Sequence, residues 1–160
     1  MILLGIDPGL VQTGYGLIKI KDNTKNILDY GTISPKKSDS LAQRLNTIHE
    51  DISYIIKKHK PSIMAIEEVF YGKNVKSALL LGHARGVLMV NASKKSIPVF
   101  EYSARKIKQS ITGNGTAHKS QVQFMIMKEF NINNSNFSYD ASDALAIALC
   151  HFNQIKINEL

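Results

Sequence analysis

The sequence predicts an α/β domain with a central, mixed five-stranded sheet flanked by helices. Five short apolar runs bounded by turn residues are typical of strands, and apolar residues recur at helical spacing between and after them. The first three runs are joined by short connections, which predicts an antiparallel meander. The predicted strands are residues 2–7, 13–20, 27–33, 63–70 and 97–102.

The composition fits one globular domain, residues 1–160, with an acidic partner. Hydrophobic residues make up 44% of the chain and charged residues 21%, enough to bury one core. No apolar run is long enough to span a membrane and no cleavable leader is recognisable, so we expect a cytoplasmic protein. The formal net charge of +7 suggests a polyanionic partner, most commonly nucleic acid. The single cysteine, Cys150, excludes an internal disulfide and argues against a cysteine-based metal site.

In two of the predicted strands an apolar run is followed directly by a carboxylate. Asp7 closes the first strand just before a Pro-Gly turn, and Glu67 follows the apolar run 63–66 of the fourth. A charge there is costly to desolvate unless a cation or a hydrogen-bond donor offsets it, although Asp before Pro-Gly is also ordinary turn chemistry. If the two strands lie side by side and parallel, their carboxyl ends bring Asp7 and Glu67 together.

Glycines stand out in two predicted elements. Gly14 and Gly16 lie inside the second strand, where glycine weakens pairing, so they indicate close backbone approach near the end of the first strand. Gly82 and Gly86 lie on one face of a predicted helix over residues 74–93, although glycine is a poor helix former. We expect this face to permit close helix packing, including contact between two copies of the chain.

The other helices have recognisable starts. Apolar residues at helical spacing from Leu41 to Ile56 predict a helix with Ser38 as its N-cap. Lys57, Lys58 and Lys60 form its last turn, and Pro61 is its stop. Pro98 predicts an edge position for the fifth strand, and Ser103 caps the short basic helix after it.

The last two predicted helices begin with charged residues. His118 and Lys119 lie at the start of one of them. For His118, a solvent-exposed position near the helix cap is a commoner role than a contact to DNA phosphate. Asp140 and Asp143 lie in the first turn of the last helix, residues 139–152. Residues three apart share a helix face, about 5–6 Å apart at Cβ. Acids there also compensate the helix dipole, so the pair has two explanations.

Four acids therefore stand out as candidate metal ligands. Carboxylates without a cysteine cluster suit a hard cation such as Mg²⁺ or Mn²⁺. Two such ions about 4 Å apart hold the attacking and leaving oxygens of a phosphodiester in line. A basic protein with an acidic metal centre is typical of a nuclease. The four acids are Asp7, Glu67, Asp140 and Asp143.

Short motifs through nearly the whole chain resemble the RuvC family of Holliday-junction resolvases, which have the RNase H-like fold. Each motif is weak alone, but their order and spacing together are specific. The matching residues are Gly5-Ile6-Asp7-Pro8-Gly9 with Thr13-Gly14-Tyr15-Gly16, Ala65-Ile66-Glu67-Glu68-Val69-Phe70, Lys73-Asn74 with Ser77-Ala78, Gly82 with Ala84-Arg85-Gly86, Lys119-Ser120-Gln121-Val122, and Asp140-Ala141-Ser142-Asp143-Ala144-Leu145-Ala146.

The resemblance implies an RNase H-like nuclease that cuts four-way DNA junctions. It implies a homodimer that makes paired nicks in strands of like polarity, two divalent ions per site, and the RuvA–RuvB branch-migration complex as a partner. The four acids become its metal ligands, with Glu67 chosen over Glu68, and strand alternation agrees that only one of that pair faces the site. The resemblance also implies that Lys119 is a catalytic residue near the scissile phosphate. The implied DNA-binding residues are Phe70, Lys73, Arg85, Lys108 and Lys119.

Two other functions are weighed against this one. An actin-like ATPase also begins with a strand that ends in an acid, but it needs two such domains, and 160 residues supply one. A non-cleaving junction-binding protein of the same fold gains nothing from carboxylates aimed at phosphate, because they repel DNA. Metal-dependent nicking of a synthetic junction separates these functions.

Overall fold

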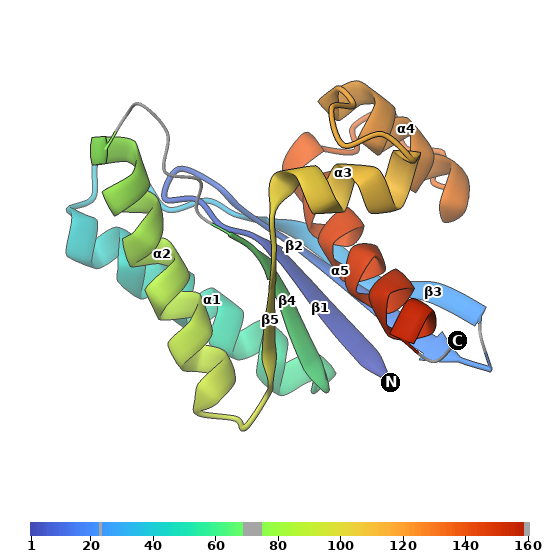
Figure 1. The fold of residues 1–160 in the computed structure, drawn as a ribbon. Coiled ribbons are helices and arrows are strands. Elements are labelled where there is room, and N and C mark those ends of the chain that lie inside the picture. The colour runs from blue at the N-terminus through green and yellow to red at the C-terminus, as the bar shows by residue number, and fades with distance from the viewer. Residues whose placement is uncertain (23, 69–74, 159–160) are drawn as a thin grey trace.

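A five-stranded sheet runs through the middle of the protein, with helices on both faces (Figure 1). The computed structural model describes residues 1–22, 24–68 and 75–158. Within these ranges, no helix is both long and apolar enough to cross a membrane. The elements are β1 (Ile2–Asp7), β2 (Thr13–Lys21), β3 (Thr24–Ile33), α1 (Leu41–His59), β4 (Ile63–Glu67), α2 (Val75–Ser93), β5 (Val99–Tyr102), α3 (Ala104–Thr112), α4 (Lys119–Glu129) and α5 (Tyr139–Asn158).

The strand order β3-β2-β1-β4-β5 confirms the predicted mixed sheet. β1, β2 and β3 form the antiparallel meander, whereas β4 pairs parallel to β1 and β5 parallel to β4. In the parallel register Ile6 lies opposite Ile66, so the residues that follow them, Asp7 and Glu67, leave the sheet at the same edge. β5 is an edge strand, as Pro98 predicts.

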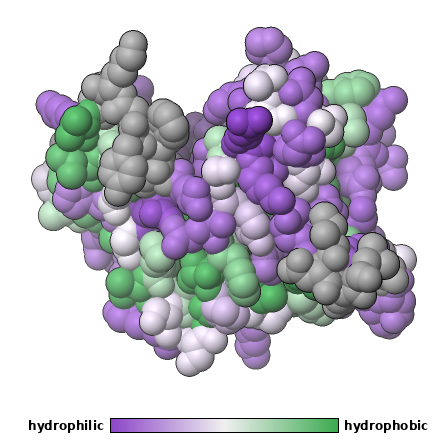
Figure 2. Space-filling view, viewed as in Figure 1, coloured by the Kyte–Doolittle hydropathy of each residue, from purple (hydrophilic) through white to green (hydrophobic). Residues whose placement is uncertain are grey.

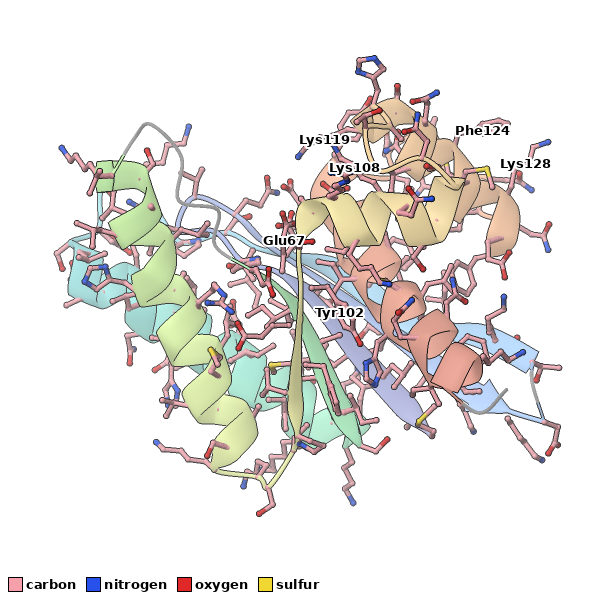
Figure 3. The ribbon with its side chains drawn as sticks, in the orientation of Figure 1. Glu67, Tyr102, Lys108, Lys119, Phe124 and Lys128 are labelled. Atoms are coloured by element: carbon pink, nitrogen blue, oxygen red, sulfur yellow. The ribbon has the colours of Figure 1, made fainter. Side chains whose placement is uncertain are left out.

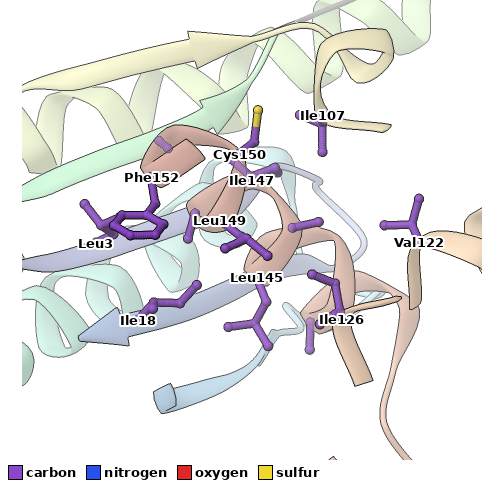
Figure 4. Close-up of a cluster of buried hydrophobic side chains, with 14 of the residues drawn as sticks. Leu3, Ile18, Ile107, Val122, Ile126, Leu145, Ile147, Leu149, Cys150 and Phe152 are labelled. Atoms are coloured by element: carbon purple, nitrogen blue, oxygen red, sulfur yellow. The ribbon is translucent and has the colours of Figure 1, made fainter. Parts of the chain in front are cut away.

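The helices form one layer on each face of the sheet (Figure 1). α1 and α2 pack against one face around a core that includes Ile48, Ile52 and Leu88. α3, α4 and α5 cover the other face, where α5 contacts β1 and β2 most extensively. Leu145, Ile147 and Leu149 of α5 form the centre of this second core (Figure 4). Cys150 is fully buried in it.

Glycines in β1 and β2 let α5 approach the sheet backbone closely. A Cβ on Gly5 would lie 2.0 Å from the carbonyl oxygen of Ala144. A Cβ on Gly14 would lie 2.0 Å from the carbonyl oxygen of Asp140, and one on Gly16 would lie 2.7 Å from the side chain of Leu145. The close approach predicted from Gly14 and Gly16 is therefore confirmed, and the approaching element is the last helix.

Several element ends differ from the prediction. α1 is capped by Ser40 and not by Ser38, because Ser40 has Gln43 three residues later. The Gln43 N–H donates to Ser40 Oγ, and the Ser40 N–H donates to Gln43 Oε1, at 3.3 and 2.8 Å. β4 ends at Glu67, and α5 continues to Asn158, beyond the expected residue 152.

We predict that Gly5→Ala destabilises the fold strongly. The new methyl group would meet the Ala144 oxygen and, at 2.7 Å, the Ala148 nitrogen, both of which belong to the backbone of α5. We expect the free energy of unfolding to fall by about 1–3 kcal/mol or more, measured by urea denaturation. Gly82→Ala is the matched control, because no heavy atom lies within 4 Å of its position. It should gain up to about 1 kcal/mol from helix propensity. Equal losses in both variants would contradict the proposed close approach.

Candidate active site

A cleft of about 320 Å³ opens at the carboxyl ends of β1 and β4. It lies where the surface is indented between the α2 side and the mainly hydrophilic α3–α4 side (Figure 2). Glu67 lies at the base of this region, with Lys108 and Lys119 above it (Figure 3). The lining residues are Asp7, Pro8, Glu67, Glu68, Leu81, Ala104, Ile107, Lys108, Lys119, Val122, Asp143 and Ile147.

The turn after β1 is fixed by its own hydrogen bonds. The Thr13 hydroxyl, fully buried, donates to the carbonyl oxygen of Gly9 at 2.6 Å. Arg44 of α1 reaches the same turn, where its Nη2 donates to the Leu10 oxygen at 2.6 Å. These contacts fix the backbone directly after Asp7, so its carboxylate is held at the carboxyl end of β1.

The first turn of α5 brings the third carboxylate to the cleft. Ser138 caps this helix, because its Oγ accepts from the Ala141 N–H at 3.2 Å. Phe137 before it is buried and packs edge-on against Tyr30, with ring centroids 5.2 Å apart. Asp143 then lines the cleft, whereas Asp140 does not, and lies beside Gly14 of β2. Asp140 is still close enough for its charge to raise the pKa of Asp7 and of Asp143.

Burial and mutual repulsion make these carboxyl groups difficult to ionise. The pKa of Asp7 is raised to about 8, first by burial and then by the charges of Glu67 and Asp143. Burial is also the main cause that raises the pKa of Glu67 and the pKa of Asp143. Like charges gathered in a partly desolvated site are unfavourable unless a cation joins them.

Lys119 supplies part of the missing positive charge. Its Nζ lies 3.2 Å from Asp143 Oδ2, and this ion pair is the main cause that raises the pKa of Lys119. The charge of Lys119 also lowers the pKa of Asp7 and of Glu67. The Lys119 side chain is 66% exposed, whereas that of Asp143 is 17% exposed, so the ammonium group remains accessible from solvent.

The donor set fits a hard divalent cation. Carboxylate oxygens are the ligands that Mg²⁺ and Mn²⁺ prefer. Within the described ranges, no group of three or more His, Cys, Asp or Glu is already arranged to hold a metal ion. The raised pKa values of Asp7, Glu67 and Asp143 reflect burial and repulsion between the carboxylates. A divalent cation would offset that same repulsion.

Some predicted site residues lie elsewhere. Arg85 is paired with Glu101 of β5, and its side chain is only 14% exposed. Phe70 and Lys73 lie outside the described residues. Glu68 also lines the cleft, although strand alternation predicted that only Glu67 would face it. The reason is that β4 ends at Glu67, so the alternation of side chains does not continue to the exposed Glu68.

His118 is the exposed N-cap of α4. Its backbone N–H donates to Gln121 Oε1 at 2.8 Å. This agrees with the commoner explanation for a histidine at a cap. A phosphate contact by its ring stays a prediction.

The fold and the cleft together define a class of protein. A mixed sheet with acids from its first strand, its fourth strand and its last helix is an RNase H-like nuclease. The family model for crossover junction endodeoxyribonuclease RuvC matches residues 3–151. The chain therefore belongs to the RuvC family, as its motifs indicate.

Individual relatives agree with this assignment. Crossover junction endodeoxyribonuclease RuvC of Halothermothrix orenii is 43% identical over 159 residues, which is 99% of this chain and 96% of the relative. The RuvC of Idiomarina loihiensis is 49% identical over 154 residues, which is 94% of this chain and 86% of the relative. A solved structure of T. thermophilus RuvC in complex with a Holliday junction substrate has a TM-score of 0.91 at 27% identity. It covers 99% of this chain and 96% of the other.

We predict that Asp7→Asn makes the metal-free protein more stable at pH 8. Asp7 has an ordinary pKa of 3.8 and a folded pKa of about 8. Between these values the folded state binds more protons than the unfolded state, so wild-type stability falls as pH rises toward 8. Asparagine has no such proton to lose. The variant should therefore exceed wild type by about 1–4 kcal/mol at pH 8, with the difference closing toward pH 4.

Urea denaturation in EDTA between pH 4 and 8.5 measures this difference. Parallel pH profiles for the two proteins would show that Asp7 is not strained by its surroundings. Added Mg²⁺ should favour wild type, because only the aspartate offers it an anionic ligand.

Proposed function

We propose that this RuvC-family protein is a structure-selective endonuclease that resolves four-way DNA junctions by paired, metal-dependent nicks in strands of like polarity. The observation that carries the proposal is the cleft itself. Three carboxylates from three separate elements meet two lysines there, in a protein of net charge +7. Acids that repel DNA have no use in a binding module, whereas they suit the hydrolysis of a phosphodiester.

The acids are the proposed metal ligands. Asp7, Glu67 and Asp143 line the cleft, and Asp140 lies next to it on the same turn of α5 as Asp143. We infer Mg²⁺ as the ion, two per site, with Mn²⁺ as a substitute. When bound, such ions polarise the phosphate and generate the attacking hydroxide. The parallel pairing of β1 with β4 and the capped start of α5 fix the backbone positions from which these side chains extend.

The lysines are proposed to hold the scissile phosphate. Lys119 and Lys108 come from neighbouring helices and face the acids across the cleft. Lys119 has an exposed ammonium group that can pass from Asp143 to a phosphate oxygen and there stabilise developing charge. The DNA contacts of Phe70 and Lys73 stay predictions. Arg85 as a DNA contact also stays a prediction, but its ion pair with Glu101 gives that role no support.

We further propose that two copies of the chain associate through α2. The exposed side of this helix carries apolar and small residues, and a Cβ on Gly82 or Gly86 would meet no heavy atom within 4 Å. A junction offers two equivalent strands, so a two-fold dimer with one site per copy is the economical arrangement. The exposed residues on this side of α2 are Val75, Leu79, Gly82, Gly86 and Val90, which together form the glycine stripe.

We also propose the RuvA–RuvB complex as a partner and the cytoplasm as the location, because the family implies both.

Asp7→Asn should abolish nicking while junction binding persists or tightens. The variant loses a metal ligand, which we expect to lower the nicking rate by about 10³-fold or more. It also loses a negative charge that repels phosphate. A synthetic four-way junction with Mg²⁺ measures nicking, and a gel-shift titration measures binding. Asp51→Asn, at an exposed site on α1 across the sheet, is the control and should behave as wild type. A folded Asp7 variant that loses binding together with cleavage would contradict the assignment.

Gly86→Leu should shift the protein toward monomer and uncouple the two nicks. A leucine at this open position adds volume between two α2 helices that pack closely. Sedimentation equilibrium measures the association, and a cruciform plasmid distinguishes single nicks from paired ones. Lys128→Leu, which exposes a leucine on α4, controls for added surface hydrophobicity. An unchanged dimer would remove this face of α2 from consideration.

A further inference from the structure

The two cleft lysines are connected by one short segment of chain. Lys108 lies in the middle of α3, and Lys119 is the first residue of α4. Residues 113–118 join the two helices. The position of Lys119 over the acids therefore depends on how this loop is held relative to α3.

The side chain of Gln109 binds the loop at two points. Its Nε2 donates to the carbonyl oxygen of Gly113 at 2.7 Å, and its Oε1 accepts from the Gly115 N–H at 2.9 Å. The amide thus uses both of its polar ends on the loop backbone, one residue along the chain from Lys108. Gly113 has a left-handed φ of +76° and forms the C-cap of α3, so the chain reverses at the point where Gln109 holds it.

Further hydrogen bonds carry this order from Gln109 to α4. The Asn114 Oδ1 accepts from the Thr116 N–H at 2.9 Å and from the Thr116 hydroxyl at 2.8 Å. Ala117 is buried, and its N–H donates to the backbone carbonyl oxygen of Asn114 at 3.2 Å. The next residue is the N-cap of α4. The loop therefore has ordered contacts from the end of α3 to the residue before Lys119.

Lys119 needs such support because its own contacts are few. Among the described residues, its ammonium group has one ion pair, the 3.2 Å contact with Asp143, and two thirds of the side chain is exposed. A lysine side chain has four rotatable bonds and does not by itself fix the position of its ammonium group. The position of the Lys119 Cα therefore determines which region the ammonium group can occupy. A displacement of about 1 Å at a reacting centre costs up to about 10²-fold in rate.

We propose that Gln109 is a positioning residue, whose two hydrogen bonds to the 113–118 loop place Lys119 against the acids and the scissile phosphate. The inference rests on the proposed function of the cleft. Gln109 is not among the lining residues and has no part in binding metal. It acts through Lys119 alone.

Gln109→Ala should lower the single-turnover nicking rate of a four-way junction by about 10-fold to 10²-fold. The junction Kd, measured by gel shift, should change less than about 3-fold, because every phosphate-binding lysine is still present. Gln154→Ala is the matched control. Gln154 also lies on a helix, and its side chain makes no hydrogen bond in the described part of the chain. A rate within about 2-fold of the control would overturn the proposal.

A double-mutant cycle separates positioning from a structural role. If Gln109 acts through Lys119, then Gln109→Ala costs less than about 2-fold in a Lys119→Ala background. An equal loss in both backgrounds would show that Gln109 acts on the fold or on other groups, and the proposal would fail. Gln109→Asn, whose shorter side chain does not reach both loop atoms, should repeat the result of the alanine variant.

A readout without cleavage keeps this test independent of the proposed function. Acetylation by limiting acetic anhydride, followed by mass spectrometry, reports the reactivity of Lys119 relative to the exposed Lys128. Gln109→Ala should raise that ratio, because Lys119 loses its ion pair with Asp143. An unchanged ratio would overturn the positioning role. A wild-type protein that fails to nick junctions would instead overturn the proposed function, while the acetylation ratio still decides the role of Gln109.

Discussion

The contact between α5 and the glycines of β1 and β2 determines the geometry of the whole site. Backbone lies against backbone here, because Gly5 and Gly14 have no side chains to separate the helix from the sheet. This brings the first turn of α5, with Asp140 and Asp143, to the edge where β1 ends in Asp7. A side chain at either glycine would push the helix away. The packing of α5 against the sheet therefore also places Asp140 and Asp143 beside Asp7.

The cost of this assembly is electrostatic. Three partly desolvated carboxyl groups face one cleft, and their raised pKa values show that the folded protein opposes their full ionisation. The fold keeps this unfavourable group because the sheet and α5 are stabilised by an extensive apolar core behind it. Lys119 relieves part of the repulsion. The remaining repulsion is of the kind that a divalent cation offsets, and the RuvC family implies dependence on a divalent metal.

The two faces of the sheet serve different purposes. On one face, α3, α4 and α5 supply the lysines, the loop that connects them and two of the acids. On the other face, α1 and α2 form a layer whose outer helix presents the open glycine stripe. The cleft lies between these layers at the carboxyl ends of the parallel strands.

The sequence by itself determined the elements and the acids. The strand that ends in Asp7, the apolar run before Glu67, the glycines of β2, the edge position of β5 and the acidic start of α5 are local patterns, and each was found where predicted. The end of β4 at Glu67 was not, because the predicted strand continued to residue 70. The serine that caps α1 was also recognisable from the sequence, because Gln43 three residues after Ser40 completes a capping box. Local patterns failed at Glu68, since alternation holds only while the strand lasts. Only the tertiary structure decided the pairing of Lys119 with Asp143 and of Arg85 with Glu101. Such contacts depend on where whole elements pack, and side-chain periodicity along one element contains no information about that.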